Sequence, residues 1–175
     1  MSAVVRRILP DDGYALAVLR HEALRREPHA FAMSVSQLAL LHDASWTQLC
    51  HRNATGTDAL FVATNDGALI GMVGCRVDNS DKMVHCGMIW GMYVAAAYTG
   101  RGYGSQLIRA AIAHGAHLQL RMLKLSVTVN QLHAIALYQR HGFQVYAHEP
   151  ALLCIDNQEI DALHMVYRYS DGGTL

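Results

Sequence analysis

Hydrophobic and polar residues follow two different periods along this chain. In residues 13–26 apolar side chains return every three or four positions, a spacing that predicts a helix with one buried face. A short strand is expected before it at residues 4–9, and a second helix after it, starting beyond Ser34 or Ser36 and broken by residues 54–58. The expected buried positions are Leu16, Leu19, Ala23 and Leu24 in the first helix, and Leu38, Leu41, Trp46 and Leu49 in the second.

From residue 59 the pattern changes to runs of strand length. Residues 59–64, 68–79 and 83–94 are rich in β-branched and other apolar residues and predict three strands. Asp66-Gly67 is a strong signal for a two-residue hairpin turn, and residues 80–82 supply a second polar turn. The three runs therefore predict an antiparallel meander.

The cysteines bear on this meander and on metal binding. A turn centred on Ser80 and Asp81 would place Cys75 opposite Cys86, and two reduced buried thiols are expected there, because disulfides are uncommon in cytosolic proteins. The four cysteines form no C-x-x-C pair, which argues against a zinc site or a thioredoxin-like motif. The other two are Cys50 and Cys154.

Helix and strand patterns alternate in the second half of the chain. A helix follows residue 104, a strand is expected at 123–129, and a further helix at 132–143 is ended by Gly142. Two last strands are expected at 144–149 and 159–169. The first of these helices should bury Leu107, Ile108, Ala111, Ile112 and Gly115. The order of elements predicts a mixed α/β fold, in a single domain over residues 1–175.

Composition and charge remove several classes of function. The 175 residues are 52% hydrophobic and 16% charged with a net charge of +0, so no broad basic field favours nucleic acid or an anionic membrane. The apolar runs are too short to span a bilayer, and arginines interrupt the start of the chain where a signal peptide needs apolar residues. A cytoplasmic protein is expected. His114 and His117 are one helical turn apart without a third ligand nearby, so no metal is expected.

The stretch "YTGRGYGSQLI" (98–108) places three glycines between a predicted strand and a predicted helix. The first turn of a helix has backbone N–H groups without internal partners, and glycines allow a phosphate to approach them closely. Arg101 could add a charge-assisted contact. The spacing G-x-G-x-G differs from the dinucleotide G-x-G-x-x-G and lacks the Lys-Ser/Thr of a P-loop, so a different pyrophosphate ligand is indicated.

Three stretches resemble the GNAT superfamily of acetyl-CoA-dependent N-acyltransferases. "MIWGMYVAAAYTGRGYGSQLI" resembles motif A of that family, and "LSVTVNQLHAIALYQRHGF" resembles motif B at the expected distance downstream. The opening "RRILPDDGYALAVLRHEALRREPHAFAMS" resembles the N-terminal strand and helices of some members. The likeness extends from about residue 4 to residue 169. It implies a mixed, mostly antiparallel sheet of about six to seven strands with about four helices, split by a V-shaped cofactor cleft between the fourth and fifth strands.

The resemblance implies direct acetyl transfer from acetyl-CoA to a primary amine of a small molecule or a peptide, without a metal. Pyrophosphate would bind the backbone amides of residues 100–105, and the pantetheine arm would pair with residues 92–94 like an added strand. Tyr138 matches a tyrosine often assigned as general acid to the leaving thiolate. The implied cofactor-binding residues are Met92, Tyr93, Val94, Gly100, Arg101, Gly102, Tyr103, Gly104, Ser105 and Gln131.

Some positions depart from the family pattern. Thr99 stands at the first Gln/Arg of motif A, and Gln131 stands where motif B has asparagine, which removes or changes two contacts to the cofactor. Met88 stands where some members carry a glutamate base. His85 is therefore a candidate base, with Glu22 and a chain of water molecules as alternatives.

The acceptor site would involve the first two helices, the fourth strand and the last hairpin. Phe31, Trp90 and Tyr98 are its candidate lining residues, and each is equally explained as a core aromatic. The charge balance gives no preference among amino acids, peptide N-termini, polyamines and drug amines. A non-catalytic acyl-CoA sensor or interaction module on the same fold is the alternative function. Dimers are common in the family, which makes a homodimer one assembly to test.

Overall fold

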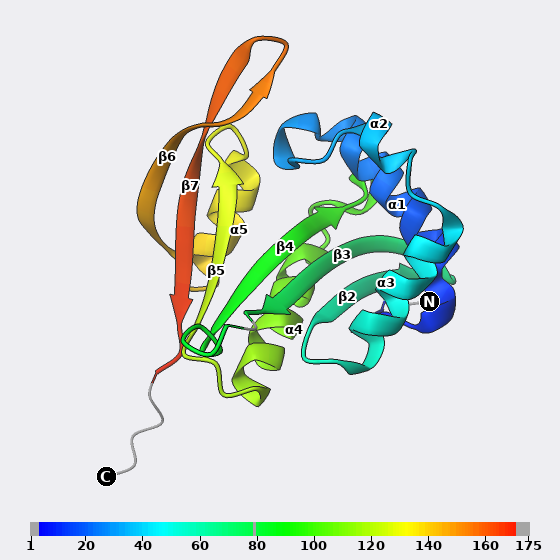
Figure 1. Cartoon of the computed structure of the whole chain (residues 1–175), viewed down its shortest axis with the longest axis horizontal. Coiled ribbons are helices and arrows are strands. Elements are labelled where there is room, and N and C mark those ends of the chain that lie inside the picture. Colours follow the sequence, from blue (N-terminus) through cyan, green and yellow to red (C-terminus); the bar gives the residue numbers. More distant parts are fainter. Residues whose placement is uncertain (1–3, 79, 171–175) are drawn as a thin grey trace.

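The computed structural model describes residues 4–78 and 80–170, which are built around one twisted sheet (Figure 1). Its seven strands lie in the order β1-β2-β3-β4-β5-β7-β6, and every neighbouring pair is antiparallel except β4 and β5. The strands are β1 (Val4–Arg7), β2 (Ala59–Asn65), β3 (Ala68–Val77), β4 (Cys86–Val94), β5 (Met122–Thr128), β6 (Gln144–Ile155) and β7 (Gln158–Arg168). The predicted mixed, mostly antiparallel sheet is confirmed.

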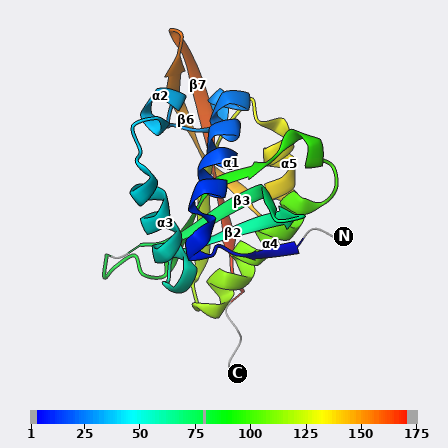
Figure 2. The ribbon, with the colours of Figure 1, turned by 90° about the vertical axis from the view of Figure 1, so that its right-hand side faces the viewer.

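Helices cover both faces of this sheet (Figures 1 and 2). On one face the buried side of α1 packs with α3 against β2 and β3, around Leu16, Trp46 and Met72. On the other face α4 and α5 enclose a second core with Leu107 and Phe143. The α-helices are α1 (Gly13–Arg26), α2 (Val35–Leu38), α3 (Asp43–Thr55), α4 (Tyr103–His117) and α5 (Leu132–Arg140), and the 3-10 turns are η1 (Pro10–Asp12), η2 (Pro28–Ala30) and η3 (Ala96–Tyr98). No helix in the described ranges is long and apolar enough to cross a membrane.

The sheet is split in its middle. β4 pairs with β5 only from Cys86 to Met88, which lie beside residues 122–124, and the two strands then separate (Figure 1). Just beyond this point the register between β3 and β4 shifts, and Gly91 adopts a φ of +64°. Such a bulge bends the strand, and glycine accepts this backbone without strain. The split and the bulge together open a gap between two halves of one sheet.

The second predicted helix is two helices. A capping box in which Ser34 Oγ accepts from the Gln37 amide starts the four-residue α2, and the chain then extends at His42 before α3 begins. The interruption changes the helical phase. Leu38 and Trp46 are buried as predicted, whereas Leu41 is 39% exposed, so its assignment to the buried face was wrong.

The predicted pairing of Cys75 with Cys86 is also wrong. Cys75 lies opposite Ile89, because the connection between β3 and β4 takes up residues 78–85 instead of a two-residue turn. The side chain of Asp78 accepts from the Ser80 amide at 2.8 Å, and two further turns follow before β4 begins. Cys75 and Cys86 are both buried free thiols.

The last hairpin is longer than predicted. β6 continues past residue 149 to Ile155, through an irregularity between Glu149 and Leu153 that contains Pro150 and a positive φ at Ala151. Proline is tolerated there because β6 is an edge strand of the sheet. The turn itself is Asp156-Asn157, with both residues at positive φ as a tight hairpin requires.

Candidate active site

A cavity of about 440 Å³ opens where β4 and β5 separate. Its walls come from β4, the loop after η3, the start of α4, β5, α5, and the end of α1 with η2. Residues from both faces of the sheet line it, because the cavity passes through the split. The segments that carry the sequence motifs therefore meet in one place.

The glycine stretch forms a bare backbone surface in this cavity. Gly100 and Gly102 have φ values of +72° and +85°, and a Cβ at either position would find no atom within 4 Å. Gly102 is the N-cap of α4, and the first helical bond runs from the Gln106 amide to the Gly102 carbonyl. The amides of residues 103–105 thus lack helical partners and lie at the positive end of the helix dipole. This geometry suits an anionic ligand.

Gly104 serves a different purpose in the same loop. A Cβ there would lie 3.2 Å from Leu137 Cδ2 and 3.4 Å from Met92 Cε, so the missing side chain lets α4 lie close to α5 and β4. Arg101, by contrast, is exposed and lies outside the cavity lining, with its guanidinium carbon 5.4 Å from the centre of the Tyr98 ring. The other predicted members of the loop line the cavity: Gly100, Gly102, Tyr103, Gly104 and Ser105.

The free edge of β4 forms the next part of the cavity. Met92, Tyr93 and Val94 line it, and they lie beyond the last residue pair between β4 and β5. An extended ligand can therefore add to this edge as a strand would. With the bare glycine surface at one end, the described residues fit the elongated, phosphorylated cofactor implied by the sequence.

Tyr138 lies on the α5 side of the cavity and is 6% exposed. Burial raises the pKa of its phenol, so the side chain keeps its proton throughout the physiological range. Its ring packs 5.8 Å from that of Phe143 between ring centres. No described residue hydrogen-bonds to its hydroxyl, which leaves that group available to a ligand.

The two candidate bases, His85 and Glu22, both lie outside the cavity lining. His85 precedes β4 at the end where the strands still pair, outside the cavity lining, and its carbonyl accepts from the Arg121 amide at 2.9 Å. Glu22 accepts from the Tyr93 hydroxyl at 3.0 Å. Burial and then this bond to Glu22 raise the pKa of Tyr93.

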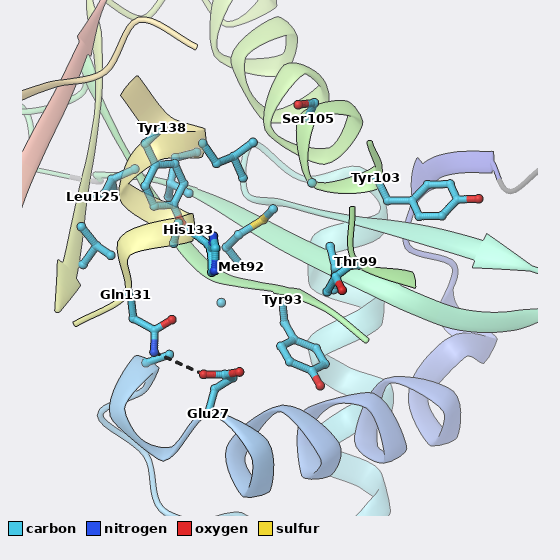
Figure 3. Close-up of a pocket in the computed structure, with 18 of the residues that line it drawn as sticks. Glu27, Met92, Tyr93, Thr99, Tyr103, Ser105, Leu125, Gln131, His133 and Tyr138 are labelled. Carbon is cyan, nitrogen blue, oxygen red and sulfur yellow. Dashed lines mark hydrogen bonds between the residues drawn. The ribbon is translucent and has the colours of Figure 1, made fainter. Parts of the chain in front are cut away.

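The structure adds polar residues to the cavity, of which the sequence singled out only Gln131. Glu27 and Gln131 face each other across the cavity and are joined by a 3.3 Å hydrogen bond from the Gln131 amide (Figure 3). His133 and Arg140 of α5 also line the cavity. Glu27 is the last residue before η2 and has no local pattern that marks it, so only the folded chain brings it to Gln131.

The three predicted acceptor residues, Phe31, Trp90 and Tyr98, all line the cavity. Trp90 also borders a second cavity of about 410 Å³ between α1, α3 and the sheet. Arg20 reaches this border: its guanidinium carbon lies 5.1 Å from the centre of the Phe31 ring, and its buried Nη1 has no hydrogen-bond partner among the described residues. The charged residues of the second cavity are Arg20, Arg52, Arg76 and Asp58.

The described residues contain no group of three or more His, Cys, Asp or Glu side chains arranged to hold a metal ion. His114, one of the two helical histidines, is instead hydrogen-bonded through Nε2 to the Thr57 carbonyl at 2.7 Å.

A split sheet with a bare helix N-terminus beside it defines the scaffold of a GNAT-type acyltransferase. Residues 18–143 match the model of the acetyltransferase (GNAT) family, and the chain belongs to that family. The resemblance inferred from motifs A and B is thereby confirmed.

Solved structures show the same fold over nearly the whole chain. An acetyltransferase of the GNAT family from Streptococcus pneumoniae superposes with a TM-score of 0.88 at 22% identity, over 96% of this chain and 100% of that one. A phosphinothricin acetyltransferase from Sinorhizobium meliloti, solved in complex with AcCoA, superposes with a TM-score of 0.83 at 18% identity, over 100% of this chain and 92% of that one.

A curated relative has closer sequence similarity over a shorter stretch. The spermine/spermidine N(1)-acetyltransferase of Bacillus subtilis is 39% identical over 61 residues. That stretch covers 33% of this chain and 40% of the relative.

Proposed function

We propose that the protein is an acetyl-CoA-dependent N-acetyltransferase that acts on a primary amine. The proposal rests on one observation: the bare amides at the start of α4 and the free edge of β4 line the same cavity. Family membership and the amine named for the Bacillus subtilis relative support it. A small-molecule or peptide amine is the proposed acceptor.

Each wall of the cavity has a role in this proposal. Acetyl-CoA supplies an acetyl thioester. The amides of residues 103–105, with Gly100 and Gly102, hold its phosphates, and the edge of Met92–Val94 holds its pantetheine arm. A backbone amide of that edge polarises the thioester carbonyl as the amine attacks it. Tyr138 donates its proton to the departing sulfur.

A non-catalytic acyl-CoA-binding module is the alternative. The Thr99 hydroxyl donates to the Ala96 carbonyl at 3.0 Å, so the side chain at this motif position is used within η3. Met88 supplies no base. A sensor of this kind would bind acetyl-CoA without consuming it.

Calorimetric titration with acetyl-CoA, beside a thiol-release assay on pooled amines, tests the proposal. The pools should separate polyamines, peptides with free N-termini and amines that carry a carboxylate, because Arg20, Arg52 and Arg76 line the cavity next to Trp90. Binding with turnover supports the enzyme, and binding without turnover on any pool favours the sensor. Absence of binding contradicts both functions.

The proposal extends to the oligomeric state of the protein and to its cellular compartment. A cytoplasmic homodimer is the arrangement we expect by analogy with the family. Light scattering of the purified protein and fractionation of its host cells measure the two properties. A monomer would leave the cavity complete, because one chain supplies all of the lining residues described above.

A further inference from the structure

Three polar side chains from adjacent strands form a continuous hydrogen-bonded chain. The Ser126 hydroxyl lies 2.8 Å from His164 Nδ1, and His164 Nε2 lies 2.5 Å from the carboxylate of Glu149. Ser126 on β5 and His164 on β7 are direct register partners, and Glu149 comes from β6 on the other side of β7 (Figure 1). A hydroxyl, an imidazole and a carboxylate are thus linked in the order used for proton transfer in hydrolases.

This chain ends in the cavity. Ser126 lines it, whereas His164 and Glu149 lie behind Ser126 in the sheet. Leu125 and Val127 belong to the core with α5, so strand alternation directs Ser126 to the opposite face. Thr128, on the same face as Ser126, donates to the His29 carbonyl in η2 at 2.8 Å. Ser126 therefore faces the α1–η2 side, on the opposite face of β5 from Tyr138.

The surroundings of His164 define its proton positions. A carboxylate accepts only, so the bond to Glu149 places the proton of a neutral imidazole on Nε2 and leaves the Nδ1 lone pair to accept from Ser126. The Tyr146 ring lies 6.0 Å away between ring centres, and Lys124 lies two residues before Ser126 on the same strand face. Side-chain exposure is 27% for His164 and 44% for Glu149.

We propose that Ser126, His164 and Glu149 form the proton relay that deprotonates the acceptor amine, an inference that rests on the proposed function. The ammonium loses a proton to the Ser126 oxygen as Ser126 passes its own proton to His164 Nδ1. The resulting imidazolium is stabilised by the Glu149 carboxylate. The free amine then attacks from the face of the sheet opposite Tyr138, and the imidazolium returns its proton to solvent. In this scheme Ser126 contacts the substrate, His164 accepts the proton through it, and Glu149 positions His164.

The hairpin provides a matched control. His148 Nε2 lies 3.0 Å from the Asp161 carboxylate, which is a second histidine–carboxylate pair across β6 and β7. Neither residue lines the cavity. Loss of this pair should affect the stability of the hairpin as loss of the His164–Glu149 pair does, but it should leave proton transfer intact.

The kinetic test measures the pH dependence of kcat/KM for four variants: Ser126→Ala, His164→Gln, Glu149→Gln and His148→Gln. All are assayed with the same acceptor, so that the ionisation of the acceptor amine affects every profile equally. His164→Gln and Ser126→Ala should lower kcat/KM about 10²-fold and flatten the acidic limb of the profile. Glu149→Gln should lower kcat/KM as well, because His164 then loses the carboxylate that positions it. His148→Gln should match the wild type. An unchanged acidic limb in His164→Gln would overturn the relay.

A second measurement needs no turnover. Nitrogen-15 NMR of the imidazoles in the ligand-free protein should show His164 protonated at Nε2 and unprotonated at Nδ1 when neutral. The opposite tautomer would overturn the relay, since Nδ1 could not then accept the proton of Ser126.

Intact mass after incubation with acetyl-CoA should show no acetyl group on Ser126. An acetylated Ser126 would make the serine a nucleophile and also overturn the relay. A wild type without turnover on any amine would count against the proposed function instead.

Discussion

At the scale of single residues, environment decides what Tyr138 can do. Its phenol is 6% exposed and packed against Phe143, and burial raises its pKa. A phenol in this state is always protonated at working pH, so it can give a proton to a developing thiolate but cannot act as a base. Packing thus keeps Tyr138 protonated, as the proposed acid must be when the thiolate forms.

Tyr138→Phe should separate binding from chemistry. The ring and its contact with Phe143 are kept, and only the hydroxyl is lost. We expect kcat on an identified acceptor to fall by about 10²-fold while the affinity for acetyl-CoA changes little. Pre-steady-state kinetics should accompany the measurement to show that the chemical step limits the rate. If the variant and the wild type had the same rate for the chemical step, Tyr138 would not be the general acid.

Asp12 is a residue whose charge contributes to stability instead. Two guanidinium nitrogens of Arg6 contact its carboxylate at 2.6 and 2.9 Å, and the Leu9 amide donates to it at 2.8 Å. Burial alone would raise the pKa of Asp12, but these bonds and the charge of Arg6 outweigh it and hold the pKa below its usual value. The stabilisation is therefore present above about pH 4, the reference value for aspartate, and is lost as pH falls through the lower folded-state pKa.

Asp12→Asn should lower the free energy of unfolding by about 1 kcal/mol at pH 7. The difference from the wild type should shrink below about pH 4, because the unfolded wild-type carboxylate begins to take up a proton there and the folded one follows at its lower pKa. Urea denaturation at several pH values measures both effects. The exposed neighbour Asp11→Asn is the control. A difference that stays constant down to pH 2 would contradict the role assigned to the charge.

Local motifs made some of these residues predictable and left others hidden. The glycines at 100, 102 and 104 and Tyr138 stand in short patterns whose spacing follows from one loop or one helix. Ser126, Glu149 and His164 are separated by 23 and 15 positions, and only the register of β5, β7 and β6 brings them into contact. Sequence spacing contains no information about that register.

At the scale of elements, the beginning of α4 is the most specialised part of the chain. Two positive φ values precede the helix, and its first amides face the cavity without side chains between them. A ligand phosphate is attracted by both the N–H groups and the helix dipole. Any negative charge placed there by the protein would compete for the same groups.

Gly102→Asp should abolish acetyl-CoA binding for that reason. The variant puts a carboxylate at the N-cap of α4, where it would accept from the free amides. A non-glycine residue at the observed φ of +85° also costs about 1–2 kcal/mol. Calorimetry measures the affinity, and circular dichroism confirms that the variant is folded. Gly67→Asp is the control for strain, because Gly67 has a φ of +83° in a hairpin away from the cavity. Wild-type affinity in folded Gly102→Asp would refute the phosphate assignment.

The elements themselves were largely predictable, with errors at their ends. Hydrophobic patterns and turn signals located every α-helix region and every strand of the described residues, although the edge strands β1 and β6 contain no buried residue. The break at residues 39–42 was missed because no glycine or proline marks it, and the long connection at residues 78–85 was missed because it depends on a bond of the Asp78 side chain with the Ser80 amide. Such bonds outweigh the average turn preferences from which the prediction was made.

At the scale of the whole molecule, the sheet consists of two parts that share little hydrogen bonding. β1 to β4 form one part and β5 to β7 the other, joined directly by three residue pairs. An extended ligand along β4 would add backbone bonds within this gap. Binding should therefore stabilise the molecule as a whole and not only its loops.

Acetyl-CoA should raise the melting temperature by mass action. At a concentration of 100 times Kd the expected gain is about 2.7 kcal/mol, which for a chain of this size corresponds to roughly 5–10 °C. Differential scanning fluorimetry measures the shift, and hydrogen exchange should show added protection in residues 92–94. S-acetylpantetheine, which lacks the phosphates, should give a smaller shift. Added hydrogen-exchange protection in the loops alone, without added protection in β4, would contradict strand-like binding.

The placement of the free β4 edge also bears on self-association. An unpaired strand edge at the rim of a sheet recruits other chains and can nucleate aggregates. Here the outer edges are the four-residue β1 and the proline-containing β6, whereas the free stretch of β4 lies inside the sheet between α4, α5 and η2. A foreign polypeptide strand would bring side chains on both faces between these elements, whereas the pantetheine arm brings few. The fold thereby leaves this strand edge open to an extended ligand while keeping it away from the rim of the sheet, where other chains could pair with it.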